Sequence, residues 1–186
     1  MNRFFMKSKT LMSIVFLFAG IWGGCDQHKN LIADQREKEV SGLIRYYVNH
    51  ELKRDSIFLF DKSTNLLTEI CIDNILAENK DINLKKEDIL NMSQKDTLTW
   101  SNKLVPIARI ISNNALPIIN SLPDKIRDKE GQLFYLANPI FSKDFSYAIL
   151  QSSFVCGSRC GERSILLFKK EKDSWTLLKT YCKIEY

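Results

Sequence analysis

The chain has 186 residues, of which 45% are hydrophobic, 26% charged and 11% aromatic, a size and composition that exclude collagen, coiled-coil and disordered chains and fit one ordinary globular domain. The formal net charge of +5 includes three basic residues that precede an apolar segment at residues 11–22. From Cys25 onward, 24 basic residues (27 less those three) stand against 22 acidic ones, a net charge of +2. Because no stripe rich in Lys and Arg occurs, the sequence argues against a nucleic-acid partner.

Residues 1–24 have the parts of a bacterial secretory signal peptide. A basic stretch, residues 1–10, is followed by the apolar run Leu11–Trp22 and then by Gly23 and Gly24, directly before Cys25. The apolar run is too short for the roughly 20 residues that a helix needs to cross a bilayer. We therefore expect this segment to direct export and then to be removed.

The two glycines before Cys25 resemble the lipobox of bacterial lipoproteins, in which the cysteine is acylated and becomes the mature N-terminus. Trp22 stands where Leu is usual, and such looser lipoboxes look like those of Bacteroidetes lipoproteins. The resemblance implies a diacylglyceryl group and an N-acyl chain, such as palmitate, on Cys25, which suffices for stable membrane anchoring. It also implies a location in the cell envelope, periplasmic or surface-facing, and leaves the choice of inner or outer membrane open.

The alternative for Cys25 is a fifth cysteine behind an ordinary cleaved signal peptide. An unpaired thiol is unusual in a secreted chain, whereas lipidation of Cys25 leaves an even four of the five cysteines for pairing. This count favours the lipoprotein interpretation independently of the lipobox.

After a short polar tether, residues 25–30, the chain is expected to form a single α+β domain, residues 31–186. Its first part, residues 31–123, is expected to be mainly helical. Apolar residues spaced by three and four predict an amphipathic helix over residues 31–54, with acidic residues early and basic residues late, as the helix dipole favours. These apolar residues are Val40, Leu43, Ile44, Tyr47, Val48 and Leu52.

Three shorter elements follow the predicted helix. Ser56–Phe60 has the length and composition of a strand. Leu66–Glu78 fits a helix or a strand by periodicity, and its length favours a helix, while Leu84–Met92 predicts another short helix with Asn83 as its N-cap. Three prolines interrupt residues 93–123, so we expect that region to be packed but irregular.

The last third, residues 133–186, is rich in β-formers separated by turn residues. Connections this short force neighbouring strands to run antiparallel. We therefore predict a four-stranded antiparallel meander with the N-terminal helices packed on one face, an α+β fold. The four predicted strands are Leu133–Phe141, Tyr147–Val155, Ser164–Lys170 and Trp175–Ile184.

Cys156 and Cys160 lie in the distinctive string Cys-Gly-Ser-Arg-Cys-Gly, which ends at Gly161. Two cysteines four residues apart on the turn of an exported protein predict a local disulfide. The spacing differs from the Cys-x-x-Cys of catalytic dithiols, and a zinc site would need a second close pair of ligands. Arg159 at the tip of this turn is the candidate recognition residue.

Cys71 and Cys182 remain as the second pair. Such a bridge would tie the helical part to the last strand, and the alternative is that Cys71 is a buried free thiol.

The C-terminal region resembles that of many uncharacterised Bacteroidetes lipoproteins. The shared features are the segment Ile140–Ile149, the Cys-Gly/Cys-Gly turn, and then Leu166–Leu177 with its lysine-rich hairpin and Trp175. The resemblance implies a fold and a cellular location but no activity. For Trp175 we expect a place in the core or over a sheet edge, with a ligand-stacking platform as the alternative.

Catalytic residues are hard to assemble from this sequence. His28 and His50 lie where neither would serve a nucleophile, and no phosphate-binding, nucleotide-binding or metalloprotease motif occurs. Four carboxylates occur at helical spacing: Glu69, Asp73, Glu87 and Asp88. The sequence therefore predicts no catalytic residue, cofactor or metal, and favours a binding or scaffolding module whose protein or small-molecule ligand is open; the alternative is an envelope hydrolase that uses paired carboxylates.

Overall fold

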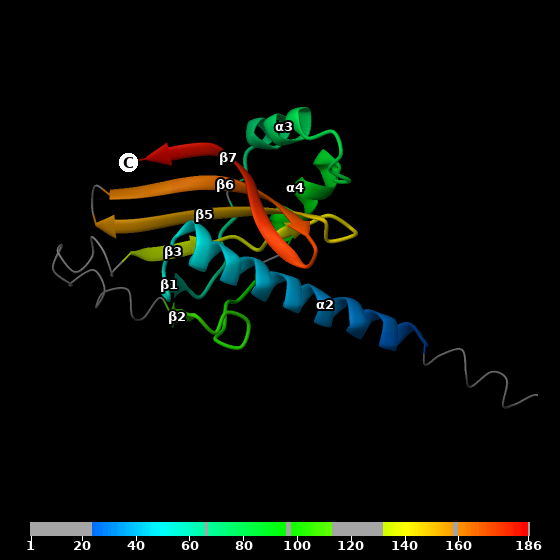
Figure 1. Ribbon diagram of the computed structural model, residues 1–186, viewed down its shortest axis with the longest axis horizontal. Coiled ribbons are helices and arrows are strands. Elements are labelled where there is room, and N and C mark those ends of the chain that lie inside the picture. The colour runs from blue at the N-terminus through cyan, green and yellow to red at the C-terminus, as the bar shows by residue number, and fades with distance from the viewer. Residues whose placement is uncertain (1–23, 66, 96–97, 113–131, 158–159, 186) are drawn as a thin grey trace, which may run out of the picture. The chain divides into compact units, whose positions relative to one another are not determined.

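The computed structural model in Figure 1 describes residues 24–65, 67–95, 98–112, 132–157 and 160–185. The chain divides into two compact units, residues 1–38 and residues 39–186, which are described separately. In the first unit the described residues are helical, because helix α2 begins at Gly24 and runs to Tyr46. Residues 25–30, predicted as a polar tether, are thus part of a helix. Residues 1–23 of the predicted signal peptide, residues 1–24, lie outside the described residues.

Helix α2 ends in a widened turn. The π-helical segment η1, Tyr47–Glu51, follows it directly, and the amide of Leu52 donates to the carbonyl of Tyr47 at 3.0 Å. This wider turn puts two successive side chains, Tyr47 and Val48, on the buried side. Lys53 then takes a φ of 53°, which ends the helical path. The helix predicted over residues 31–54 therefore exists, with an earlier start and an end near residue 51.

The sheet has seven strands among the described residues, three more than the predicted four-stranded meander. Its order is β2-β1-β3-β5-β6-β7, with β4 paired to β5. The first two strands pair in parallel, and so do β1 and β3, whereas the remaining pairs are antiparallel. The strands are β1 (Ile57–Phe60), β2 (Ala108–Ile111), β3 (Leu133–Leu136), β4 (Ile140–Phe141), β5 (Tyr147–Gly157), β6 (Cys160–Glu171) and β7 (Ser174–Glu185).

The antiparallel half is the predicted meander with one correction. The run Leu133–Phe141 is two short strands, β3 and β4, and both pair with β5. The parallel half is the addition: the predicted strand at Ser56–Phe60 is β1, and β2 lies inside the region expected to be irregular. The sheet is therefore mixed, and the fold class is α+β.

Helices cover both faces of the sheet, not one as predicted. The α2 face is the face on which buried residues from Val40 to Val48 pack, and the α3/α4 face is the face covered by helices α3 (Glu69–Glu78) and α4 (Lys86–Lys95). In β6, alternate residues of the buried run Ile165–Phe168 point to the two faces. A strand buried on both faces gives an unbroken apolar run, so the run Ile165–Phe168 is the feature of the sequence that indicates a second covered face.

The two short helices occupy nearly the predicted positions. The ambiguous segment before residue 79 is helical, as its length indicated, and begins at Glu69. Helix α4 begins at Lys86, three residues after the predicted N-cap Asn83. Between the two helices, Ile82 and Leu84 are buried in the cluster on the α3/α4 face.

Candidate functional site: the disulfide between α3 and β7

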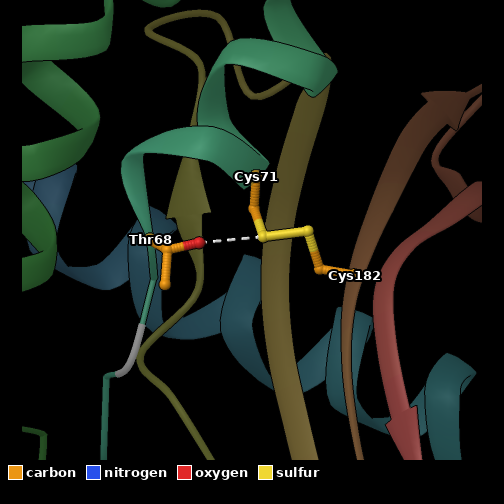
Figure 2. Close-up of a disulfide and its surroundings, with 3 residues drawn as sticks. All are labelled: Thr68, Cys71 and Cys182. Carbon is orange, nitrogen blue, oxygen red and sulfur yellow. Dashed lines mark hydrogen bonds between the residues drawn. A yellow bond between two sulfur atoms is a disulfide. The ribbon is translucent and has the colours of Figure 1, made fainter.

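Thr68 precedes helix α3 in an extended conformation, with φ −96° and ψ 150°. Its carbonyl accepts hydrogen bonds from the amides of Cys71 and Ile72 at 3.1 and 3.2 Å. Its side chain makes no capping hydrogen bond to the backbone. Instead, the Thr68 hydroxyl donates to Cys71 Sγ at 3.0 Å, as Figure 2 shows. The residue that starts the helix is therefore also a polar partner of the sulfur in its first turn.

Cys182 reaches α3 because strand β7 is bulged there. Tyr181 pairs with Ile165 and Ile184 pairs with Arg163, so two residues, Cys182 and Lys183, lie opposite one residue of β6. Cys182 has a φ of 48°, a conformation that non-glycine residues seldom adopt. In a regular strand, consecutive residues point to opposite faces. The bulge allows Cys182 to join Tyr181 on the α3/α4 face.

Cys71 and Cys182 form a disulfide with Cα atoms 6.1 Å apart across 111 residues of sequence. The two sulfurs come from different surroundings, since Cys71 is 6% exposed and Cys182 is half-buried. This pairing is the second of the two expected from the sequence, and it ties the helical layer to the last strand.

A polar network at the other end of α3 holds the same two elements together. Asn79 Nδ2 donates to the Tyr181 hydroxyl at 2.8 Å, and that hydroxyl donates to Glu78 Oε2 at 2.9 Å. Lys179 Nζ forms an ion pair with the same carboxylate at 2.6 Å. Burial raises the pKa of Tyr181, and the hydrogen bond from Lys179 lowers the pKa of Glu78. These contacts fix the C-terminal end of α3 to β7 without a covalent bond.

Two of the four candidate carboxylates form ion pairs with the same lysine. Glu69 and Asp73 form ion pairs with Lys86 Nζ at 3.1 and 2.9 Å, and the hydrogen bond to Asp73 raises the pKa of that lysine. The other two, Glu87 and Asp88, lie in the first turn of α4. The arrangement joins α3 to α4 at the surface, whereas a glycosidase-type pair needs two carboxyl groups that face a common substrate.

The second disulfide joins Cys156 and Cys160 at the end of the β5–β6 hairpin, with Cα atoms 5.1 Å apart. Cys156 is buried at a register shift between the two strands, and Cys160 is exposed. The candidate recognition residue Arg159 lies outside the described residues. Cys25, the predicted lipidation site, falls in α2, but its side chain is outside the description too.

Trp175 has the core position that was expected for it. It is buried on the α2 face, with its ring 5.7 Å from that of Phe141 and with Lys170 Nζ 5.9 Å from its centroid. His50 stacks on Tyr46 with ring centroids 4.7 Å apart. His28 lies on α2, and its side chain is not described.

Several interacting residues were not predicted from the sequence. The first is Thr68, which only the position three residues before Cys71 could have indicated. The second is an ion pair between buried Glu39 and Lys170 at 2.6 Å, formed across 131 residues. The third is a hydrogen bond from Tyr147 to Asp81, which raises the pKa of Tyr147 to about 12. The separations of 131 residues in the second contact and 66 in the third leave no local pattern in the sequence.

Comparisons of the chain with protein-family models, with curated proteins and with solved structures gave no match. Within the described residues, no group of three His, Cys, Asp or Glu side chains is placed to hold a metal ion. No helix in that part of the chain is long and apolar enough to span a bilayer.

Proposed function

We propose that this protein is a lipid-anchored protein of the bacterial cell envelope, held by acylated Cys25, whose α+β domain binds or scaffolds a partner at the membrane surface. The observation that carries the proposal is the number of cysteines and how they pair. Two disulfides use four of the five cysteines, and the fifth directly follows Gly23 and Gly24. Structural disulfides belong to exported proteins, and a cysteine at this position resembles a lipobox cysteine.

A binding or scaffolding role is favoured over hydrolysis by the state of the carboxylates. Glu69 and Asp73 both form ion pairs with the ammonium of Lys86. The two carboxylates of such a hydrolase flank a common substrate, whereas these two are engaged by a lysine of the neighbouring helix. The resemblance to Bacteroidetes lipoproteins agrees with a location in the cell envelope and implies no enzymatic activity.

Cys25→Ser tests the anchor. We expect the variant to incorporate no radiolabelled palmitate and either to remain an uncleaved precursor or to leave the membrane fraction. The matched control is Cys156→Ser with Cys160→Ser, which also removes sulfurs but should keep both the label and the membrane association. Equal membrane association and unchanged mass for Cys25→Ser would overturn the proposal.

The role of the anchored domain is tested by complementation of a deletion strain. If the domain binds or scaffolds, the two double variants Glu69→Gln/Asp73→Asn and Glu87→Gln/Asp88→Asn should restore the envelope phenotype. Cys25→Ser should not, because the domain is then displaced from its surface. Loss of complementation by a carboxylate variant that accumulates to normal levels would favour the hydrolase.

A further inference from the structure

We propose that the Cys71–Cys182 bridge is a site of reversible thiol–disulfide exchange, at which an external dithiol attacks Cys182 Sγ and releases the Cys71 thiolate. The inference concerns the chemistry of this bridge and does not depend on the lipid anchor. It follows from three features around the two sulfurs: their unequal access, the stabilisation of one of them as a leaving group, and contacts that keep α3 in place when the bond is broken.

Access favours attack on Cys182. The residue is half-buried on β7, which ends the strand order of the sheet, and the next two residues, Lys183 and Ile184, are exposed. Cys71 is 6% exposed on the buried side of α3, in the cluster with Ile72. The rate of exchange depends on which sulfur a thiolate can approach.

The leaving group is stabilised at Cys71. The Thr68 hydroxyl donates to Cys71 Sγ, and this sulfur lies in the first turn of a ten-residue helix, where the helix dipole favours negative charge. The acidic side chains of Glu69 and Asp73 share Lys86 as their ion-pair partner, whose charge offsets one of their two negative charges. A sulfur that leaves more readily as an anion accelerates exchange at its partner.

The exchange balances with the dithiol as reductant. In the first step its thiolate forms a bond to Cys182 Sγ, the bond between the two protein sulfurs breaks, and the electron pair leaves on Cys71 Sγ. In the second step the other thiolate of the dithiol attacks the dithiol sulfur that is bonded to Cys182, and the Cys182 thiolate is released. The dithiol becomes a cyclic disulfide, the protein gains two electrons, and the protein thiolates take up protons from solvent.

Helix α3 has enough other contacts to remain docked after reduction. Ile72 and Ile75 are completely buried against the sheet, and Glu78 and Asn79 hold Tyr181 through hydrogen bonds. The two thiols therefore stay near each other and can close again. A bridge whose loss unfolded the domain would not give a reversible couple.

The first test maps the attacked sulfur in the mature protein. Glutathione is used as a monothiol probe, free thiols are trapped with N-ethylmaleimide, and peptides are identified by mass spectrometry. Within this pair we expect glutathione on Cys182 and the maleimide on Cys71 in at least about ten-fold excess over the reverse. Glutathione on Cys71, or an equal division, would overturn the proposal. Peptide mapping separates this pair from the Cys156–Cys160 bridge.

The second test varies the hydrogen-bond donor. Thr68→Val keeps the shape and removes the hydroxyl, and we expect reduction by dithiothreitol to slow by about 3- to 10-fold. Thr68→Ser keeps a donor and should react within about two-fold of the wild type. The hydroxyl caps no backbone amide, so the oxidised variants should melt alike. A wild-type rate for Thr68→Val would refute the role of Thr68 and with it the directed exchange.

Reversibility is tested on the reduced wild-type protein. We expect its far-ultraviolet circular dichroism to match that of the oxidised protein, and removal of dithiothreitol in air to restore the Cys71–Cys182 pair. Unfolding on reduction, or re-oxidation to other pairs, would show that the bridge is a fixed structural cross-link.

Discussion

The two faces of the sheet are stabilised by different means. On the α2 face, large side chains such as Trp100 and Phe168 are buried almost completely, and Tyr46 and Tyr47 contact the Phe168 ring edge-on. On the α3/α4 face, two ten-residue helices bury mainly isoleucine and leucine and are joined to β7 by a disulfide and by the hydrogen bonds of Tyr181.

This difference shows that a cross-link can add stability where two short helices bury little apolar surface. Burial of apolar area stabilises in proportion to the area removed from water, so two short helices gain less than the larger aromatic cluster on the other face. A cross-link between distant residues adds stability chiefly by restricting the unfolded chain. Because the cross-link acts on the unfolded chain, we expect loss of the Cys71–Cys182 bridge to lower the free energy of unfolding while α3 stays docked in the folded state, whereas the α2 face is stabilised by packing.

The largest effect should come from replacing Cys71 and Cys182 together by Ser. The bridge closes a loop of 111 residues in sequence separation, for which loop-closure entropy gives about 5 kcal/mol. The matched control, Cys156→Ser with Cys160→Ser, opens a loop of sequence separation 4 and should lose about 2 kcal/mol. Urea denaturation of both variants measures the free energy of unfolding, and equal losses would show that the long bridge stabilises the protein no more than the short one.

The next effect concerns the ion pair on the α2 face. Lys170→Met leaves the Glu39 carboxylate buried without its cation, and because Lys170 is partly solvated we expect a loss of roughly 2–3 kcal/mol. The double variant Glu39→Leu/Lys170→Met removes both charges and should regain most of that loss. If the double variant is as unstable as the single one, the pair contributes through side-chain packing and not through charge.

Each face also contains a tyrosine that resists ionisation. Burial raises the pKa of Tyr47 to about 12, and its hydroxyl donates to Ser152 on the α2 face at 2.8 Å. On the other face, the hydrogen bond to Asp81 raises the pKa of Tyr147 to about 12. Because the folded state favours the neutral phenol, this stability is present below about pH 10 and is lost as the pH rises toward 12.

Tyr47→Phe should cost about 1 kcal/mol at neutral pH and reduce the loss of stability between pH 10 and 12. Melting curves across that range test the expectation for either tyrosine. A pH dependence identical to that of the wild type would show that the substituted tyrosine does not titrate with unfolding.

The smallest effect is expected at the β4–β5 turn, from which Phe145 packs against Phe141 on the α2 face. Hydrogen bonds from the hydroxyls of Ser142 and Ser146 lower the pKa of Asp144 to about 2. The folded state favours the carboxylate, so this contribution is present above about pH 4 and is lost as the pH falls through 2. In Asp144→Asn the melting temperature should change less between pH 4 and pH 2 than in the wild type; an unchanged slope would contradict this.

The sequence predicts the elements whose signals are local. The apolar spacing from Val40 to Leu52 marks the helix, and the long strands β5 to β7 follow one another through short turns. The parallel half depends on non-local pairing: β1 meets β2 about 50 residues later, and each has only four residues. Such pairing leaves no periodic pattern, because its partners come from distant parts of the chain.

In the candidate site too, only the features with a local signal in the sequence were predictable. Two cysteines on one turn indicate a local bridge, and the remaining pair follows by elimination. The bulge that brings Cys182 to the helix depends on the tertiary arrangement, so no sequence pattern indicates it. The only local sign of the Thr68 hydroxyl is its position three residues before Cys71.

The interrupted register of β7 has a consequence for the protein in a crowded environment. β7 spans Ser174–Glu185 and pairs with β6, and its outer edge carries amides and carbonyls that could template the addition of another chain. Register shifts at Leu178 and at Cys182 break the strand into short pieces, and Lys179 and Lys183 place ion-paired charges along them. Edge-to-edge aggregation of neighbouring molecules is thereby disfavoured, so the bulge that positions a sulfur also helps to keep the molecules apart.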